Sequence, residues 1–303
     1  MNKINLVEIT DFVDKNIGSF HHAKLKNIKE LQFEKLLRRK NPYLFKAKNI
    51  RTSEEFIKNI VDAYLSSQEE TMFGNFLESL AQFICKKTFH GHKTPGTGLD
   101  LDFIRDDVRY LVSIKSGPNW GNSRQIAKMR DDFKKASKII GQEHIVCVNG
   151  CCYGRDLNEN KGDYFKKCGQ SFWEFISGDP EFYKQIIEPL GHSAKERNDE
   201  FFEEYSKLLN RFSKRFMVDF CKDTGEIDWD RLVEFNSGIK EIKLSKSFTN
   251  AESAFPHTIK NQKDNSNKLT KSKYSLSNFL EDDSHNCAIA DSKIKYNAKK
   301  SNP

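Results

Sequence analysis

The chain has 303 residues and a formal net charge of +7 at pH 7. This length allows one large domain or two small ones, and no apolar run approaches the roughly 20 residues that a membrane-spanning helix needs. The first residues carry acids among their apolar positions and lack a small-residue cleavage site, so they do not predict a signal peptide. The cysteine count of seven is odd, which favours a reducing compartment, and we therefore expect a cytoplasmic protein.

The charge is distributed unevenly along the chain. Residues 1–48 carry about six excess positive charges and residues 240–303 about five, which leaves the middle mildly acidic. Basic flanks around an acidic centre are typical of a nuclease, in which lysines bind phosphate and carboxylates hold a metal ion. A solvated protein surface explains the same charge pattern equally well.

Apolar residues at helical spacing predict four helices in the first part of the chain, over residues 3–16, 20–40, 52–66 and 71–87. Pro42 ends the second of them, and Thr52 with Glu55 forms a capping box for the third. The fourth carries Glu78 near the edge of its apolar face. The Gly- and Pro-rich segment HGHKTPGTG then breaks the helical pattern.

The segment TGLDLDFIRDDVRYLVSIKSG predicts two short strands joined by a polar turn. Strand side chains alternate between faces, so Asp100 and Asp102 share one face of the first strand, and Ser113 and Lys115 share one face of the second. A carboxylate and a lysine can thus converge at the end of a hairpin whose other side is apolar. This is the layout that a Mg²⁺-dependent phosphodiesterase needs, because the carboxylate holds the metal and the ammonium orients water.

The following elements continue a mixed core. After the loop SGPNWGN, Asn122 is placed to cap a helix to about residue 140, whose first N–H groups point toward the hairpin end. HIVCVNGCCYG predicts a buried strand, and more helices follow. The order of helices, β-β-α-β and helices predicts an α/β fold, with a mixed sheet flanked by helices and helical additions at both ends.

The composition changes near residue 238, where Asn, Ser and Lys become dominant and helical periodicity ends. We expect a folded domain over residues 1–237, of which about residues 1–50 form an N-terminal helical part. Residues 238–303 are expected to be a low-complexity, disordered tail.

Polar side chains gather just after the second strand. Arginine and lysine suit phosphate, while asparagine, glutamine and arginine can pair with base edges. An exposed helix start explains the same pattern. The candidate DNA contacts are Asn119, Trp120, Asn122, Arg124, Gln125 and Lys128. Arg38 and Arg39 form a second candidate phosphate contact, with a solvated helix face as the alternative.

The stretch TPGTGLDLDF, followed by VSIKSGPNWGN, resembles the active-site region of the PmeII-like family of type II restriction endonucleases, which belongs to the PD-(D/E)xK nuclease superfamily. The resemblance extends over NPYLFKAKN, FGNFLESLA, VNGCCYG, CGQSFWEFISGD and EPLGH, and covers roughly residues 35–238. It implies a restriction-endonuclease-like core. It also implies Mg²⁺-dependent, sequence-specific hydrolysis of double-stranded DNA that leaves 5′-phosphates.

The resemblance assigns the superfamily aspartate to Asp100 and the superfamily lysine to Lys115. Asp100 would then hold the metal, with the backbone carbonyl of Ile114 as a further ligand. Lys115 would orient the attacking water and stabilise the developing charge.

The second acidic position of the superfamily falls on Ser113, which cannot supply a negative charge. Glu78, on the helix before the hairpin, is the best candidate for the acid that is missing. Asp102 shares its strand face with Asp100 and is an alternative metal ligand.

A symmetric DNA site that is cut on both strands is most simply served by a two-fold symmetric dimer, so we expect a homodimer. A restriction–modification system also implies a methyltransferase of matching specificity as a genetic neighbour. Two rival hypotheses are a repair or junction nuclease of the same superfamily and a catalytically decayed DNA-binding protein, which the serine at position 113 would suit.

Overall fold

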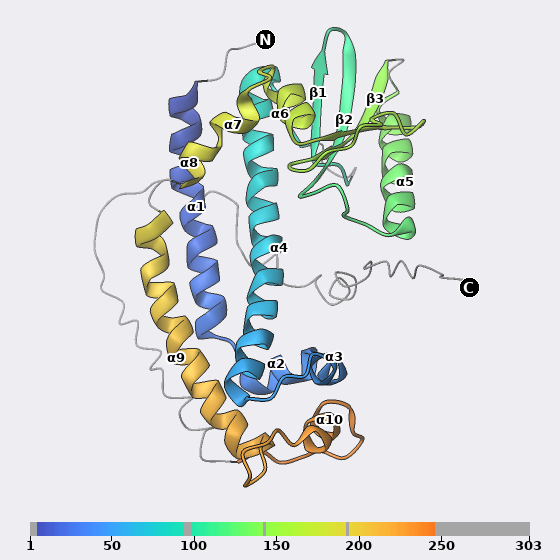
Figure 1. Ribbon diagram of the computed structural model, residues 1–303. Helices are drawn as coiled ribbons and strands as arrows, with labels where there is room; N and C mark the ends of the chain where they lie inside the picture. The colour runs from blue at the N-terminus through green and yellow to red at the C-terminus, as the bar shows by residue number, and fades with distance from the viewer. Residues whose placement is uncertain (1–4, 94–97, 142–143, 192–193, 246–303) are drawn as a thin grey trace, which may run out of the picture. The chain divides into compact units, whose positions relative to one another are not determined.

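The computed structural model describes residues 5–93, 98–141, 144–191 and 194–245 (Figure 1). The helices are α1 (Leu6–Lys29), α2 (Phe33–Arg39), α3 (Pro42–Ala47), α4 (Ser53–Phe89), α5 (Ser123–Ile140), α6 (Gln170–Ser177), α7 (Phe182–Gln185), α8 (Ile187–Gly191), α9 (Ala194–Phe220) and α10 (Trp229–Ser237). The strands are β1 (Leu101–Arg105), β2 (Val108–Lys115), β3 (Ile145–Cys151) and β4 (Phe165–Cys168). Among the described residues, none of these helices combines the length and apolarity that a membrane span requires.

The N-terminal helices differ from the prediction in where they end. Residues 17–19, the expected break, lie inside α1, because one glycine at position 18 costs only about 1 kcal/mol in a helix. The two helices expected over residues 52–66 and 71–87 are a single 37-residue helix, α4. The linking stretch SSQEE is polar but contains no glycine or proline. Its Glu69 forms an ion pair with Lys24 of α1 at 3.0 Å, so polarity there marks contact with a neighbouring helix and not a helix end.

Helix α4 belongs to two separate hydrophobic clusters. Its N-terminal half packs among helices, where Phe56 stacks on Phe216 of α9 with ring centroids 4.6 Å apart. Its C-terminal half, including Leu77 and Ile84, packs against the sheet and against α6. Figure 1 shows α4 running from the group of α2 and α3 to the sheet. Glu78 is therefore held on a helix whose two ends are both anchored in apolar cores.

The four strands form one mixed sheet in the order β1-β2-β3-β4. Strand β1 is antiparallel to β2, while β2, β3 and β4 are parallel to one another. Helix α5 covers one face through Met129 and Phe133, which pack on Leu111, and α4 and α6 cover the other. The predicted α/β class, a mixed sheet flanked by helices, is confirmed. Strand β4 was not predicted, because four residues with two lysines carry little strand signal at a sheet edge.

The apolar cluster formed mainly by α2, α3, α9, α10 and the first half of α4 is called the helical cluster below. The chain still packs against this cluster beyond α10. Ile242 and Leu244 pack against it, and Ser245 donates its backbone N–H and its hydroxyl to Asp219 Oδ1 at 2.8 and 2.7 Å. Residues 238–245 thus contact the folded body, although the composition placed them in the tail. The remainder of the predicted tail, residues 246–303, lies outside the described residues.

These contacts predict different outcomes for two truncations. Deleting residues 246–303 should leave the melting temperature unchanged, because a sequence rich in Asn, Ser and Lys offers little apolar surface for packing. Deleting residues 240–303 should lower it by roughly 5 °C, because Leu244 is lost and the buried Asp219 loses two hydrogen bonds. Differential scanning fluorimetry of both truncations beside the full chain measures this. Equal melting temperatures for the two truncations would contradict it.

Candidate active site

Asp100 directly precedes β1, and both its backbone and its side chain hydrogen-bond to the neighbouring strand β2. Its backbone N–H donates to the Val112 carbonyl at 3.0 Å, and its Oδ2 accepts the N–H of Ile114 at 2.7 Å. In an extended strand the N–H and C=O of one residue point to the same edge. The Ile114 carbonyl therefore faces the same edge of β2 as the Asp100 carboxylate, whose side chain is 14% exposed.

Ser113, on β2 beside Ile114, contacts the Asp100 carboxylate. Its hydroxyl lies 3.5 Å from Asp100 Oδ2, at the outer limit of a hydrogen bond, and its side chain is buried. The serine at the second acidic position is thus a neighbour of the aspartate and supplies no charge of its own.

Glu78 reaches the same place from α4. The Lys93 ammonium lies 3.7 Å from Glu78 Oε1 and 3.9 Å from Asp100 Oδ1. These two oxygens are therefore within about 8 Å of each other, which one hydrated metal ion can bridge. Gln82, one turn further along α4, donates to Glu78 Oε1 at 3.0 Å.

The surroundings of Glu78 disfavour its charge. Burial raises the pKa of its carboxyl above the usual value, and the nearby charge of Asp100 raises it further. The ammonium groups of Lys93 and Lys115 oppose this rise and lower the pKa of Glu78 in part. The two carboxylates thus lie close enough to repel each other, and cations compensate them from two sides.

Lys115 ends β2 and is positioned by an aromatic side chain. Its ammonium lies 5.1 Å from the centroid of the Trp120 ring, a cation–π contact. The Trp120 indole N–H donates to Asn149 Oδ1 at 2.9 Å, and the Asn149 amide donates to the Ser113 carbonyl at 3.2 Å. Asn149, which is buried on β3 opposite Ser113, thus connects the ring over Lys115 to the strand that carries Lys115.

Asp102 is bound by a different partner. Both of its carboxylate oxygens bind the Arg109 guanidinium, at 2.9 Å from Nε and 2.8 Å from Nη2, and its side chain is 1% exposed. The arginine faces Asp102 across the hairpin, near its partner Leu111 in the register. The carboxylate has a structural partner on each oxygen, which argues against Asp102 as the alternative metal ligand.

The residues expected to contact DNA divide into two groups. Asn122 and Gln125 close the capping box of α5: the Asn122 side chain accepts the N–H groups of Arg124 and Gln125, and Gln125 Oε1 accepts the N–H of Asn122. The side-chain oxygens of these two residues therefore close a helix cap. Asn119, Arg124 and Lys128 are exposed.

Arg38 and Arg39 are not brought to the same site. Arg38 donates to the Phe235 carbonyl at 3.1 Å and lies 4.4 Å from that ring, on the helical cluster around Ile57. At about 1.5 Å per residue, α4 spans roughly 30 Å between Ile57 and Glu78. The two arginines therefore belong to another part of the surface.

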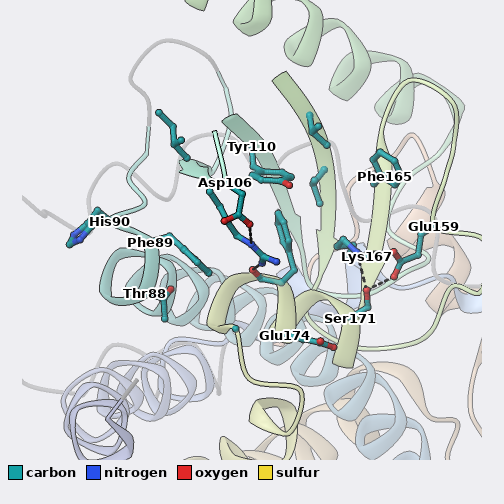
Figure 2. Close-up of a pocket in the computed structure, with 16 residues that line it drawn as sticks. Thr88, Phe89, His90, Asp106, Tyr110, Glu159, Phe165, Lys167, Ser171 and Glu174 are labelled. Atoms are coloured by element: carbon teal, nitrogen blue, oxygen red, sulfur yellow. Dashed lines mark hydrogen bonds and ion pairs between the residues drawn. The ribbon is translucent and has the colours of Figure 1, made fainter. Parts of the chain in front are cut away.

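A cavity of about 930 Å³ lies on another part of the sheet surface, and Glu78, Asp100 and Lys115 do not line it (Figure 2). It is lined by the Tyr110 side of the sheet, α6 and the end of α4. Two of its charged side chains pair with each other: Lys167 lies 2.7 Å from Glu159, and Ser171 hydrogen-bonds to that carboxylate. A second cavity, of about 1030 Å³, is lined by Ser116, which directly follows Lys115.

The donor set at the end of β2 fits a hard divalent cation. Two carboxylates and one backbone carbonyl are oxygen ligands of the kind that Mg²⁺ takes, with water and substrate phosphate completing its coordination. Within the described ranges no group of three or more His, Cys, Asp and Glu side chains gathers in metal-binding geometry. A site here would thus depend on two carboxylates, Glu78 and Asp100.

Four residues near the site were not identified from the sequence. They are Lys93, Gln82, Asn149 and Arg109. Gln82 carried a usable signal, since it is four residues after Glu78 on one helix. The other three act across the sheet or from a loop, where spacing along the chain says nothing about contact.

Comparison with known protein families gives a match. A family model described as type II restriction endonuclease EcoO109I matches residues 7–198, which is more than half of the chain. This family implies the PD-(D/E)xK superfamily expected from the motifs, while the likeness to the PmeII-like family stays a prediction. A search of curated proteins found no matching relative.

We expect Glu78→Gln to raise the melting temperature in metal-free buffer at neutral pH. A carboxyl whose pKa is raised by folding stabilises the folded state below its unfolded pKa and loses that contribution as pH rises through the folded pKa. At neutral pH, above the usual pKa of a glutamate, this contribution is smaller than in acid, whereas a neutral amide does not lose stability as the pH rises. Glu70→Gln, exposed on the same helix, is the control. An unchanged or lowered melting temperature for Glu78→Gln would contradict this reasoning.

Asp102→Asn should destabilise the fold by about 3 kcal/mol, because it breaks the bidentate ion pair between Arg109 and the buried Asp102 carboxylate. Urea unfolding followed by circular dichroism measures the loss. Asp106→Asn is a matched control in the same hairpin. Its side chain is exposed and lies 3.4 Å from Arg105, so that change should cost under about 0.5 kcal/mol. Equal stabilities of the two variants would show that the buried pair contributes nothing.

Proposed function

The chain belongs to the type II restriction endonuclease EcoO109I family and is a site-specific deoxyribonuclease, and we propose that it hydrolyses DNA at the end of strand β2, with Glu78, Asp100 and Lys115 as the catalytic residues. One observation carries the assignment. The Asp100 carboxylate accepts the backbone N–H of Ile114, the residue directly before Lys115. The Lys93 ammonium lies 3.9 Å from the Asp100 carboxylate and 3.7 Å from the Glu78 carboxylate. These contacts support a site built from Glu78, Asp100, the Ile114 carbonyl and the adjoining Lys115.

The proposed reaction is in-line attack of water on a phosphodiester, leaving a 5′-phosphate. Glu78, Asp100 and the Ile114 carbonyl would hold Mg²⁺, which supplies charge neutralisation and a more acidic bound water. Lys115 would orient the attacking water and stabilise the negative charge that develops on the phosphoryl oxygens. Glu78 thereby supplies the second carboxylate that Ser113 does not.

Trp120 has a proposed role that differs from a base contact. Its ring holds the Lys115 ammonium, and its indole N–H is tied to Asn149. A lysine side chain has many rotamers, and its loss of freedom on binding substrate reduces catalysis. Trp120 would restrict that freedom before substrate arrives. DNA contacts in this region then rest on Asn119, Arg124 and Lys128, which are exposed.

The DNA strand is proposed to pass along the cavity that Ser116 lines. Phe73 and Leu77 of α4 form one wall, and Tyr153 and Arg155 form another. The cavity begins one residue after Lys115, so a phosphodiester at the catalytic group has neighbouring nucleotides along these walls. Arg155 is exposed there and suits a phosphate.

The assembly follows from the substrate. A symmetric recognition site cut on both strands is served by two copies of one active site related by a two-fold axis, so we propose a homodimer. A methyltransferase of matching specificity is the proposed partner in the genome, since unmodified host sites would be cut.

Lys115→Ala and Asp100→Asn should each abolish Mg²⁺-dependent cleavage. The first removes a preorganised charge near the phosphoryl group, which is typically worth about a hundredfold or more in rate, and the second removes a metal ligand that also orders the end of β2. Digestion of plasmid DNA of known sequence measures cleavage. Gel shifts measure DNA binding, which Lys115→Ala should retain.

Lys138→Ala, an exposed lysine at the far end of α5, controls for loss of positive charge. Discrete bands from the wild-type digest identify site-specific cutting. A Lys115→Ala protein that cuts at the wild-type rate would remove this lysine from the mechanism, and an active Asp100→Asn protein would move the metal site elsewhere.

A further inference from the structure

We propose that Lys93 is the resident counter-ion of the catalytic carboxylates, and that its ammonium competes with Mg²⁺ for Glu78 and Asp100. The inference rests on the proposed function, because it takes these two carboxylates as the metal ligands. It assigns Lys93 a role in setting metal affinity, which is distinct from the role of Lys115 toward water and phosphate.

The position of Lys93 between the carboxylates is the first observation. Its Nζ lies 3.7 Å from Glu78 Oε1 and 3.9 Å from Asp100 Oδ1. Any cation that binds both oxygens must approach the region that this ammonium faces. A metal ion and the ammonium therefore cannot both keep their contacts with the same two oxygens.

The backbone beside Lys93 is fixed, while its side chain is free to leave. His92 exchanges two backbone hydrogen bonds with Asp102, at 3.0 and 2.8 Å, which ties this segment to β1. The Lys93 side chain is nevertheless 60% exposed. It can therefore move into solvent without any rearrangement of the strand that carries the carboxylates.

Electrostatics explains why a cation is needed there. Glu78 is largely desolvated and lies near a second carboxylate, and both effects raise its pKa. The Lys93 charge offsets that repulsion. An ammonium has one charge and donates hydrogen bonds but offers no coordination geometry, whereas Mg²⁺ has two charges and binds oxygens directly. Lys93 thus stabilises the carboxylate pair without Mg²⁺ and yields to the metal when it binds.

Two consequences follow for a variant that lacks this charge. In buffer with a chelator, Lys93→Gln should melt at a lower temperature than wild type, because the carboxylates lose their counter-ion. With Mg²⁺ alone and no DNA, it should bind the metal about threefold more tightly, since no ammonium has to be displaced. The factor is modest because the lysine is largely exposed and its ion pairs are screened by solvent.

The test compares wild type, Lys93→Gln, Lys93→Arg, Asp100→Asn and the control Lys86→Gln, an exposed lysine of α4. Isothermal titration calorimetry gives the dissociation constant for Mg²⁺, and scanning fluorimetry gives melting temperatures with chelator and with Mg²⁺. The proposal expects tighter Mg²⁺ binding and a larger Mg²⁺-induced melting shift for Lys93→Gln alone, because ligand binding raises stability with affinity. Lys93→Arg keeps the charge and should resemble wild type.

The outcomes separate this inference from the proposed function. If Asp100→Asn abolishes Mg²⁺ binding while Lys93→Gln binds no more tightly than wild type, the metal site stands and the counter-ion role is overturned. If Asp100→Asn binds Mg²⁺ as wild type does, the proposed metal site fails and the role of Lys93 fails with it. Tighter binding by Lys86→Gln as well would show a general charge effect and would also overturn the proposal.

Discussion

The continuity of helix α4 is the constraint on which the site depends. It has 37 residues, about 55 Å at 1.5 Å per residue, and its apolar residues enter both the helical cluster and the cluster under the sheet. Because both ends are anchored, Glu78 cannot shift along or around the helix without disrupting a core. The distance from Glu78 to Asp100 is thereby set by hydrophobic packing, and not by any direct bond between the two carboxylates.

The hairpin and its two charged ends were predictable because strand periodicity is local. A period of two places Asp100 and Lys115 from their neighbours alone, and the edge of an apolar helical face places Glu78. The length of α4 was not predictable in the same way. The residues from 66 to 70 are compatible with a helix and with a linker, and it is their contact with α1, a helix distant in sequence, that favours the helix.

Side-chain partners were the least predictable feature, since they come from the register between strands. Asp102 shares a face with Asp100, but the face does not reveal that Arg109 lies opposite and occupies both oxygens. Trp120 was predicted to contact a base from its residue type and place in the loop. Its hydrogen bond to Asn149, 29 residues away, could not be predicted from local sequence. Asn122 carried both a capping signal and a base-reading signal, and the capping box that it forms with Gln125 uses the side-chain oxygens of both residues.

Placing the proposed second acid at Glu78 has an energetic consequence. A carboxylate on the strand, at position 113, would lie beside Asp100 within the sheet, whereas Glu78 leans from a helix through a partly desolvated region, and this burial raises its pKa. Desolvation strengthens every interaction of the charged form, repulsion by Asp100 included. A site built in this way is costly when no cation is near and binds a cation more strongly for the same reason. The exposed Lys93 ammonium between the carboxylates is consistent with that cost, because a mobile, singly charged group lowers it without blocking a stronger ligand.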